Sequence, residues 1–201
     1  MEKIYRTLLS LVNQLFTFKM VILSVLFVFI GCSLNANQNH YKTDINVKKL
    51  EIGDTIPNII LKDQNGELFN LKAETKSKNV VLYFYPKDNT AGCTAQACSF
   101  RDQITDFTSI DAVVIGISGQ SVESHKKFAE EYKLPFTLLS DEGNKIREKL
   151  GVPSNLFGLL PGRVTYVIDK TGKVVDIINS QANIKAHISE SLKTLKKSDL
   201  I

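Results

Sequence analysis

The chain of 201 residues has only three cysteines and no tryptophan. Three cysteines are too few to hold a fold together with disulfides, and a chain of this length can build a core without them. A zinc site on a Cys-X4-Cys pair is disfavoured too, because the chain offers no two further ligands at close spacing. The odd count indicates that the three cysteines do not share one role.

Strong charge clusters and repeats are also missing. The net charge is only +4, and the one small basic cluster, Lys193, Lys196 and Lys197, is expected on the solvated face of a terminal helix. No basic stripe with interleaved aromatic residues is present, which argues against a nucleic-acid partner. The hydrophobic fraction of 43% is typical of a globular chain with a core.

An apolar run stands near the start of the chain. Residues 20–31 carry no charge, follow Lys19, and have the length of the hydrophobic region of a signal sequence. Gly31 and Cys32 come at the end of this run. A small residue followed by cysteine resembles a bacterial lipoprotein signal, in which the cysteine is lipidated, although Phe29 and Ile30 depart from the usual residues.

We therefore expect a signal peptide or membrane anchor over 1–31, a flexible tether over 32–46 and a folded domain over 47–201. An uncleaved anchor and an ordinary cleaved signal peptide stay open beside lipidation of Cys32. All three place the domain outside the cytosol or on a membrane surface, on the periplasmic or thylakoid-lumen side.

The folded part alternates strands and helices. Continuous apolar runs at 80–85 and 111–118 predict strands that are covered on both faces. Further strands are expected at 58–61, 68–71, 136–140, 164–169 and 173–178, with a polar loop at 72–79. Helices are expected after Thr90 and at 121–132, 144–150 and 182–197. This order predicts an α/β sheet with helices on both faces, in the thioredoxin arrangement.

The stretch 85–102, YPKDNTAGCTAQACSFRD, is the one in which chemistry is expected. It places Cys93 at the start of a helix that follows a buried strand. The free N–H groups and the dipole at a helix N-terminus lower the pKa of a thiol, and the thiolate is the nucleophile. Cys93 is therefore the candidate reactive cysteine.

Pro86, Thr90 and Cys93 have the spacing P-x-x-x-T-x-x-C. This pattern resembles the active-site signature of the peroxiredoxins. With Cys98 five positions further on, the stretch is similar to the bacterioferritin-comigratory or Q type. The resemblance covers about 47–201 and is closest to cyanobacterial and plastid members, with one departure at Ala91, where many members have proline.

The resemblance implies a thioredoxin fold with a central mixed sheet and a thiol-dependent peroxidase activity toward hydrogen peroxide and organic hydroperoxides. Cys93 would attack the peroxide and become a sulfenic acid, and Cys98 would resolve it to a disulfide that thioredoxin or a similar dithiol reduces. Arg163 would polarise the peroxide, Thr90 would hydrogen-bond to it, and Pro86 would shield the thiol. No metal or cofactor is expected, and the protein is expected to be a monomer.

Helix geometry adds a condition to this cycle. Five residues apart on a regular helix, the Cα atoms of Cys93 and Cys98 would be about 8.6 Å apart and point about 140° away from each other. A disulfide needs a separation of roughly 4.4–6.8 Å. We therefore expect a reduced form with an intact helix, and an oxidised form that is unwound around 95–98.

A second class of protein places two cysteines at this junction. Membrane-anchored copper chaperones with a thioredoxin fold use C-x-x-x-C, one residue shorter, together with a distant histidine. The chain has no histidine at the matching place near Arg163. His125 and His187 are expected on helices, solvated or half-buried, without a catalytic role.

Overall fold

The computed structural model describes residues 49–74, 76, 78–155 and 160–198. The expected signal or anchor segment 1–31, the tether 32–46 and the lipidation candidate Cys32 lie outside the described residues.

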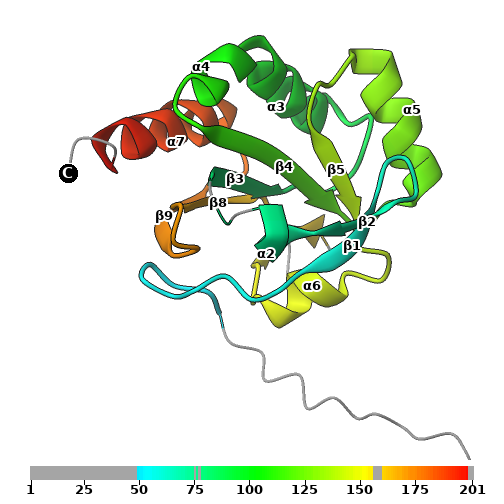
Figure 1. Cartoon of the computed structure of the whole chain (residues 1–201). Helices are drawn as coiled ribbons and strands as arrows, with labels where there is room; N and C mark the ends of the chain where they lie inside the picture. Colours follow the sequence, from blue (N-terminus) through cyan, green and yellow to red (C-terminus); the bar gives the residue numbers. More distant parts are fainter. Residues whose placement is uncertain (1–48, 75, 77, 156–159, 199–201) are drawn as a thin grey trace, which may run out of the picture. The chain divides into compact units, whose positions relative to one another are not determined.

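One mixed sheet of seven strands forms the centre of the described part, in the order β2-β1-β5-β4-β3-β8-β9 (Figure 1). The pairs β3–β4 and β4–β5 are parallel, and the other neighbouring pairs are antiparallel. The strands are β1 (Ile60–Asp63), β2 (Leu68–Asn70), β3 (Asn79–Phe84), β4 (Ala112–Ser118), β5 (Thr137–Ser140), β8 (Val164–Ile168) and β9 (Val174–Asn179).

The central strand β3 is buried along its whole length, as its continuous apolar sequence predicts. Val81 and Tyr83 face one core, and Val80, Leu82 and Phe84 face the other. This alternation follows from the two-residue period of a strand. The sheet therefore separates two hydrophobic cores.

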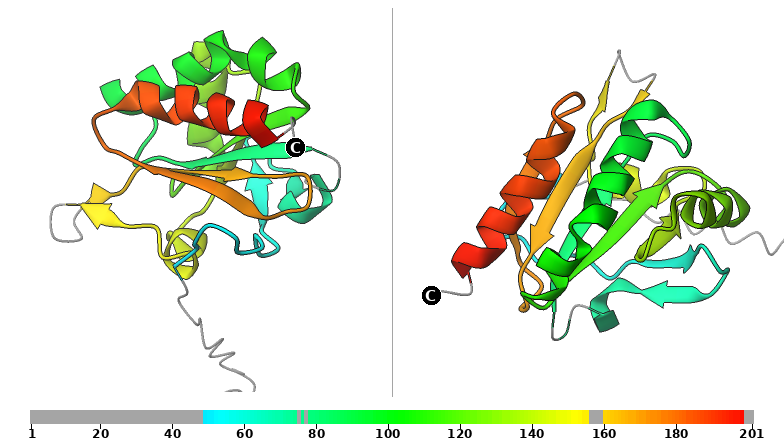
Figure 2. Two further views of the ribbon diagram at one scale, coloured as in Figure 1. Left: turned by 90° about the vertical axis from the view of Figure 1, so that its left-hand side faces the viewer. Right: turned by 90° about the horizontal axis from the view of Figure 1, so that it is seen from above.

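Four of the described helices cover one face of this sheet (Figure 2). Their buried residues belong to the same core as Tyr83. Among them, Phe100 stacks on the Tyr83 ring with 4.8 Å between the ring centroids. These helices are α3 (Ala91–Asp102), α4 (Ile104–Thr108), α5 (Val122–Tyr132) and α7 (Ile184–Ser198).

The opposite face is covered by two short helices and by the segment that precedes β1. The helices are α2 (Leu71–Glu74) and α6 (Lys145–Lys149). Leu71 and Leu150, at the ends of these helices, are buried in the second core together with Ile56 and Ile59. The prediction of helices on both faces is thus confirmed, with the thinner cover on this side.

Three small elements were not expected from the sequence. The predicted polar loop 72–79 begins inside α2, because Leu71 is fully buried and Asn70 Oδ1 accepts a hydrogen bond from the Ala73 N–H. After α3 the chain forms α4, which is separated from it by the non-helical backbone of Gln103. A two-stranded hairpin pairs β6 (Ser154–Asn155) with β7 (Leu160–Pro161).

Candidate active site

Cys93 lies in the first turn of α3, directly after the loop that leaves β3. The backbone of Asn89 has φ +55° and turns the chain, and Thr90 is the N-cap residue with extended backbone. Thr94 N–H donates to the Thr90 carbonyl over 2.8 Å, which closes the first helical turn. The Cys93 side chain is only 2% exposed, and the first-turn N–H groups have no partner within the helix.

Arg163, which directly precedes β8, contacts the Cys93 thiol. Because β8 pairs antiparallel with β3, with Val164 opposite Phe84, the residue before β8 lies beside the start of the cysteine loop. Its Nη2 donates to Cys93 Sγ over 3.3 Å. A buried guanidinium this close stabilises a thiolate relative to a neutral thiol.

Gln96 is a site residue that the sequence prediction missed. Its side-chain Oε1 accepts a hydrogen bond from Arg163 Nη1, and it is fully buried one helical turn after Cys93. The i, i+3 spacing puts both residues on one face of α3, and this was the signal available in the sequence. At Gly92, a Cβ atom would lie 3.2 Å from Arg163 Nη2, so a glycine leaves room for the guanidinium.

Thr90 and Pro86 lie in the loop before α3, although no direct contact ties either to the Cys93 sulfur in the described part. The Thr90 side chain is exposed, and its hydroxyl donates to the Lys87 carbonyl over 3.0 Å. Its proton is therefore used within the loop, and its lone pairs remain free to accept from a peroxide. Pro86 is half-buried.

Cys98 is on the same helix as Cys93, and both thiols are free. The helix α3 continues without a break from Ala91 to Asp102, so regular geometry holds the two Cα atoms about 8.6 Å apart. Cys98 is half-buried, whereas Cys93 is buried. This is the expected reduced, helical arrangement, and the unwound oxidised arrangement stays a prediction.

The expectation of solvated or half-buried histidines is wrong, because both His125 and His187 are fully buried. His125 Nδ1 lies 2.9 Å from Asp88 Oδ2, and its Nε2 lies 3.2 Å from the Leu139 carbonyl oxygen. His187 lies 2.8 Å from the Thr165 hydroxyl and 2.8 Å from the Ser180 carbonyl oxygen. Polar partners at both ring nitrogens compensate the desolvation of these rings. The sequence does not indicate their burial, because lysines stand close to both histidines.

Asp88 ties the cysteine loop to α5. Its carboxylate accepts hydrogen bonds from the Tyr85 hydroxyl over 2.7 Å and from the Ser124 hydroxyl over 2.6 Å, beside the contact with His125. Burial alone raises the pKa of Asp88, but the hydrogen bonds from His125, Ser124 and Tyr85 outweigh it and hold the pKa below its usual value. The loop between Tyr85 and Thr90 is thus anchored to α5 through Asp88.

The sequence and the fold are similar to those of proteins in one known family. The model of the AhpC/TSA family matches residues 52–177. A chloroplastic peroxiredoxin Q from Sedum lineare is 57% identical over 148 residues, which cover 74% of this chain and 79% of that protein. The chain belongs to the AhpC/TSA family, as a peroxiredoxin of the Q type. The predicted thiol-dependent peroxidase activity is thereby confirmed. Membership of this family is not consistent with the alternative, a copper chaperone.

Other relatives agree on the type and on the fold of this peroxiredoxin. The chloroplastic peroxiredoxin Q of Arabidopsis thaliana is 57% identical over 148 residues, covering 74% of this chain and 68% of that protein. The crystal structure of peroxidoxin BcpB from Mycobacterium tuberculosis has 38% identity and a TM-score of 0.69, covering 74% of this chain and 97% of that one. The bacterioferritin comigratory protein of Xanthomonas campestris, studied for its alkyl peroxide reduction activity, has 28% identity and a TM-score of 0.63, covering 70% of this chain and 91% of that one. The predicted thioredoxin fold with its mixed sheet is confirmed.

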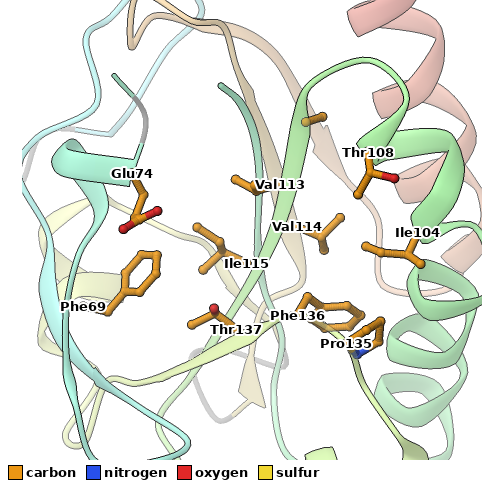
Figure 3. A pocket seen from close by; sticks show the side chains of 11 residues that line it. Phe69, Glu74, Ile104, Thr108, Val113, Val114, Ile115, Pro135, Phe136 and Thr137 are labelled. Carbon is orange, nitrogen blue, oxygen red and sulfur yellow. The ribbon is translucent and has the colours of Figure 1, made fainter. Parts of the chain in front are cut away.

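A cavity of about 180 Å³ lies away from this thiol site, at the opposite ends of the parallel strands (Figure 3). Val113 and Ile115 of β4 and Phe69 of β2 contribute apolar side chains to it. It exists because β5 begins only at Thr137, opposite Ile115, so that β4 extends beyond its neighbour. The peroxiredoxin thiols and Arg163 take no part in its lining.

The plant relatives bear on the compartment of this peroxiredoxin. The plant relatives are chloroplastic proteins, which is compatible with a plastid compartment. In residues 49–198, as far as they are described, no helix has both the length and the apolar character needed to cross a membrane.

Proposed function

We propose that Cys93 is the peroxidatic nucleophile of this enzyme. The observation that carries the proposal is the contact of 3.3 Å between Arg163 Nη2 and the buried Cys93 sulfur in the first turn of α3. The thiolate attacks one peroxide oxygen, the O–O bond breaks, and the other oxygen leaves with a proton as water or alcohol. Sulfur is oxidised to a sulfenic acid as the peroxide is reduced.

Four neighbours have distinct parts in this step. Arg163 stabilises the thiolate and the negative charge that develops on the departing oxygen. The Thr90 hydroxyl accepts a hydrogen bond from the peroxide with a free lone pair, because it donates its own proton to the Lys87 carbonyl oxygen. Pro86 shields the sulfur from water. Gln96 holds Arg163 in place through its amide oxygen.

Cys98 is the resolving cysteine in this proposal. Its thiol condenses with the Cys93 sulfenic acid, which forms the S–S bond and releases water. Thioredoxin or a similar dithiol then reduces the disulfide by exchange. Hydrogen peroxide and organic hydroperoxides are both substrates, and the alkyl peroxide activity studied in the Xanthomonas relative supports the second class.

The test is peroxide consumption coupled to a thioredoxin system. Cys93→Ser is expected to reduce the rate to the background without enzyme. Cys98→Ser is expected to keep one rapid oxidation per chain, seen as a mass increase of one oxygen, and to lose turnover. Equal turnover by wild-type protein and Cys93→Ser would refute the assignment.

We also propose that residues 1–31 bring the enzyme to a membrane surface outside the cytosol, with lipid on Cys32 and 32–46 as a tether to a monomeric domain. The uncharged run 20–31 behind Lys19 supports this. Intact-mass measurement of the membrane fraction tests it, since any mature N-terminus other than lipidated Cys32 contradicts lipidation. Analytical ultracentrifugation of residues 47–201 tests the monomer.

A further inference from the structure

Arg147, in the short helix α6, connects the two segments that build the thiol site. It is only 5% exposed. Its Nη2 donates to the Tyr85 carbonyl over 2.9 Å, and its Nη1 donates to the Gly162 carbonyl over 2.8 Å. Tyr85 opens the loop that leads to Cys93, and Gly162 directly precedes Arg163. One guanidinium therefore links two segments that are far apart in sequence.

The position of Arg147 is itself fixed. The two carboxylate oxygens of Asp141 accept hydrogen bonds from the backbone N–H groups of Ile146 and Arg147, each over 2.9 Å. The guanidinium carbon lies 5.4 Å from the centre of the Phe84 ring, at the end of β3. The Arg147 guanidinium is thus held in place by the first turn of α6 and by the end of the central strand β3.

The segment before Arg163 has no room to shift on its other side. A Cβ atom at Gly162 would lie 1.9 Å from the Pro153 carbonyl oxygen, which is far inside contact distance. The Gly162 backbone is therefore pressed against Pro153, while its carbonyl is held by Arg147. Together these contacts fix the backbone position from which the Arg163 side chain extends.

Burial of the charged Arg147 guanidinium costs desolvation free energy that an apolar side chain of similar size would not, so packing alone does not explain an arginine at this position. Its two Nη groups donate to neutral carbonyls, and its Nε is buried with no hydrogen-bond partner among the described residues. Burial lowers the pKa of Arg147 to about 10, and the charges of Asp141, then Tyr166 and last Cys93 act against this shift. The guanidinium is thus still charged at neutral pH and within electrostatic range of the thiolate.

We propose that Arg147 is a positioning residue for peroxide reduction, which bridges the Tyr85 and Gly162 carbonyls and so holds Arg163 in register with Cys93. The inference rests on the proposed roles of Cys93 and Arg163. It predicts that loss of the bridge slows attack on peroxide, for which sulfur and guanidinium must be aligned, more than attack on a reagent that needs the thiolate alone.

The test compares Arg147→Met, Arg147→Lys and the matched control Lys149→Met, which changes an exposed lysine of the same helix. Each variant is first checked for native circular dichroism and cooperative melting. Oxidation of Cys93 by hydrogen peroxide is followed by rapid quench and mass spectrometry, and alkylation of Cys93 by iodoacetamide is measured in parallel in a Cys98→Ser background.

Arg147→Met is expected to lower the peroxide rate constant by about tenfold to a hundredfold and the alkylation rate by much less. Arg147→Lys keeps the charge but has one nitrogen in place of the fork, so its peroxide rate should lie between those of Arg147→Met and wild-type protein. Lys149→Met should match the wild type. If Arg147→Met does not fold, the proposal is tested by the peroxide and alkylation rates of Arg147→Lys alone.

The proposal is overturned if peroxide and alkylation rates fall by the same factor, if the folded Arg147→Met keeps the wild-type peroxide rate, or if Arg147→Lys matches the wild type in peroxide rate. The proposed function fails differently, because it requires only that wild-type protein consumes peroxide and Cys93→Ser does not.

Discussion

At the scale of single residues, the site depends on one arginine with two partners. Arg163 donates to Cys93 Sγ through one Nη atom and to the Gln96 amide oxygen through the other. The fork geometry of a guanidinium suits this double contact, and an ammonium group cannot reproduce it. Arg163 is buried, so its charge acts on the sulfur with little screening by water.

Arg163→Met should therefore slow the oxidation of Cys93 by hydrogen peroxide by about 10²–10³-fold, because a preorganised charge at the reacting oxygen is lost. Arg163→Lys should recover only part of the rate. Rapid-quench mass spectrometry of the sulfenic acid measures both. A methionine variant with the wild-type rate constant would show that the arginine contact has no part in the chemistry.

At the scale of elements, α3 has two tasks that conflict. Its first turn surrounds Cys93 with free N–H groups, and its regular path from Ala91 to Asp102 keeps Cys98 out of reach. Burial of the Ala97 and Phe100 side chains, in the second and third turns, resists unwinding of this helix. The proposed disulfide between Cys93 and Cys98 would therefore require local unfolding of this helix.

We expect amide hydrogen exchange over residues 95–100 to become at least about tenfold faster when the protein is oxidised, since the helical N–H bonds there must break. Exchange in α5 should change little. Hydrogen exchange with mass spectrometry on reduced, oxidised and Cys98→Ser protein checks this. Slow exchange over 95–100 in protein that carries the Cys93–Cys98 disulfide would contradict the unwinding.

The elements also show what a sequence can and cannot predict. The strands β3 and β4 were predictable because strands covered on both faces have continuous apolar sequences, and the amphipathic pattern predicted α5 and α7. The helix α4 was not, because five residues carry too little periodicity. The Arg163 contact came from family resemblance alone. His125 was misjudged because Lys126 and Lys127 follow it, whereas its partners come from the distant Asp88 and Leu139.

At the scale of the whole molecule, the buried groups His187 and Asp88 are expected to make stability depend on pH. Burial lowers the pKa of His187 below its usual 6.5, with a further contribution from the charge of Arg163 and opposed by the Ser180 carbonyl. The unfolded chain then binds a proton that the folded chain does not, so stability is lost as the pH falls below about 6.5. Asp88, with its lowered pKa, stabilises the fold above 3.8 and loses this contribution as the pH falls further.

The free energy of unfolding should thus decrease between pH 7 and 5 by up to about 1.4 kcal/mol per pH unit through His187. His187→Gln should be less stable at pH 7 and should have a flatter profile in this window, whereas Asp88→Asn should keep the slope there and lose it below pH 4. Urea unfolding at pH 3–7 measures this. Equal slopes for wild type and His187→Gln would exclude His187 as the source.

The stacking of Tyr83 on Phe100, at 4.8 Å between centroids, gives this enzyme an optical reporter of its own redox state. Phe100 belongs to α3, the helix that we expect to unwind when the proposed disulfide forms, while Tyr83 lies on the central strand. Because the chain has no tryptophan, tyrosine emission is not drained by energy transfer to an indole. Each turnover should thus change the ultraviolet fluorescence of the unlabelled protein, so the catalytic cycle can be followed in real time without a dye.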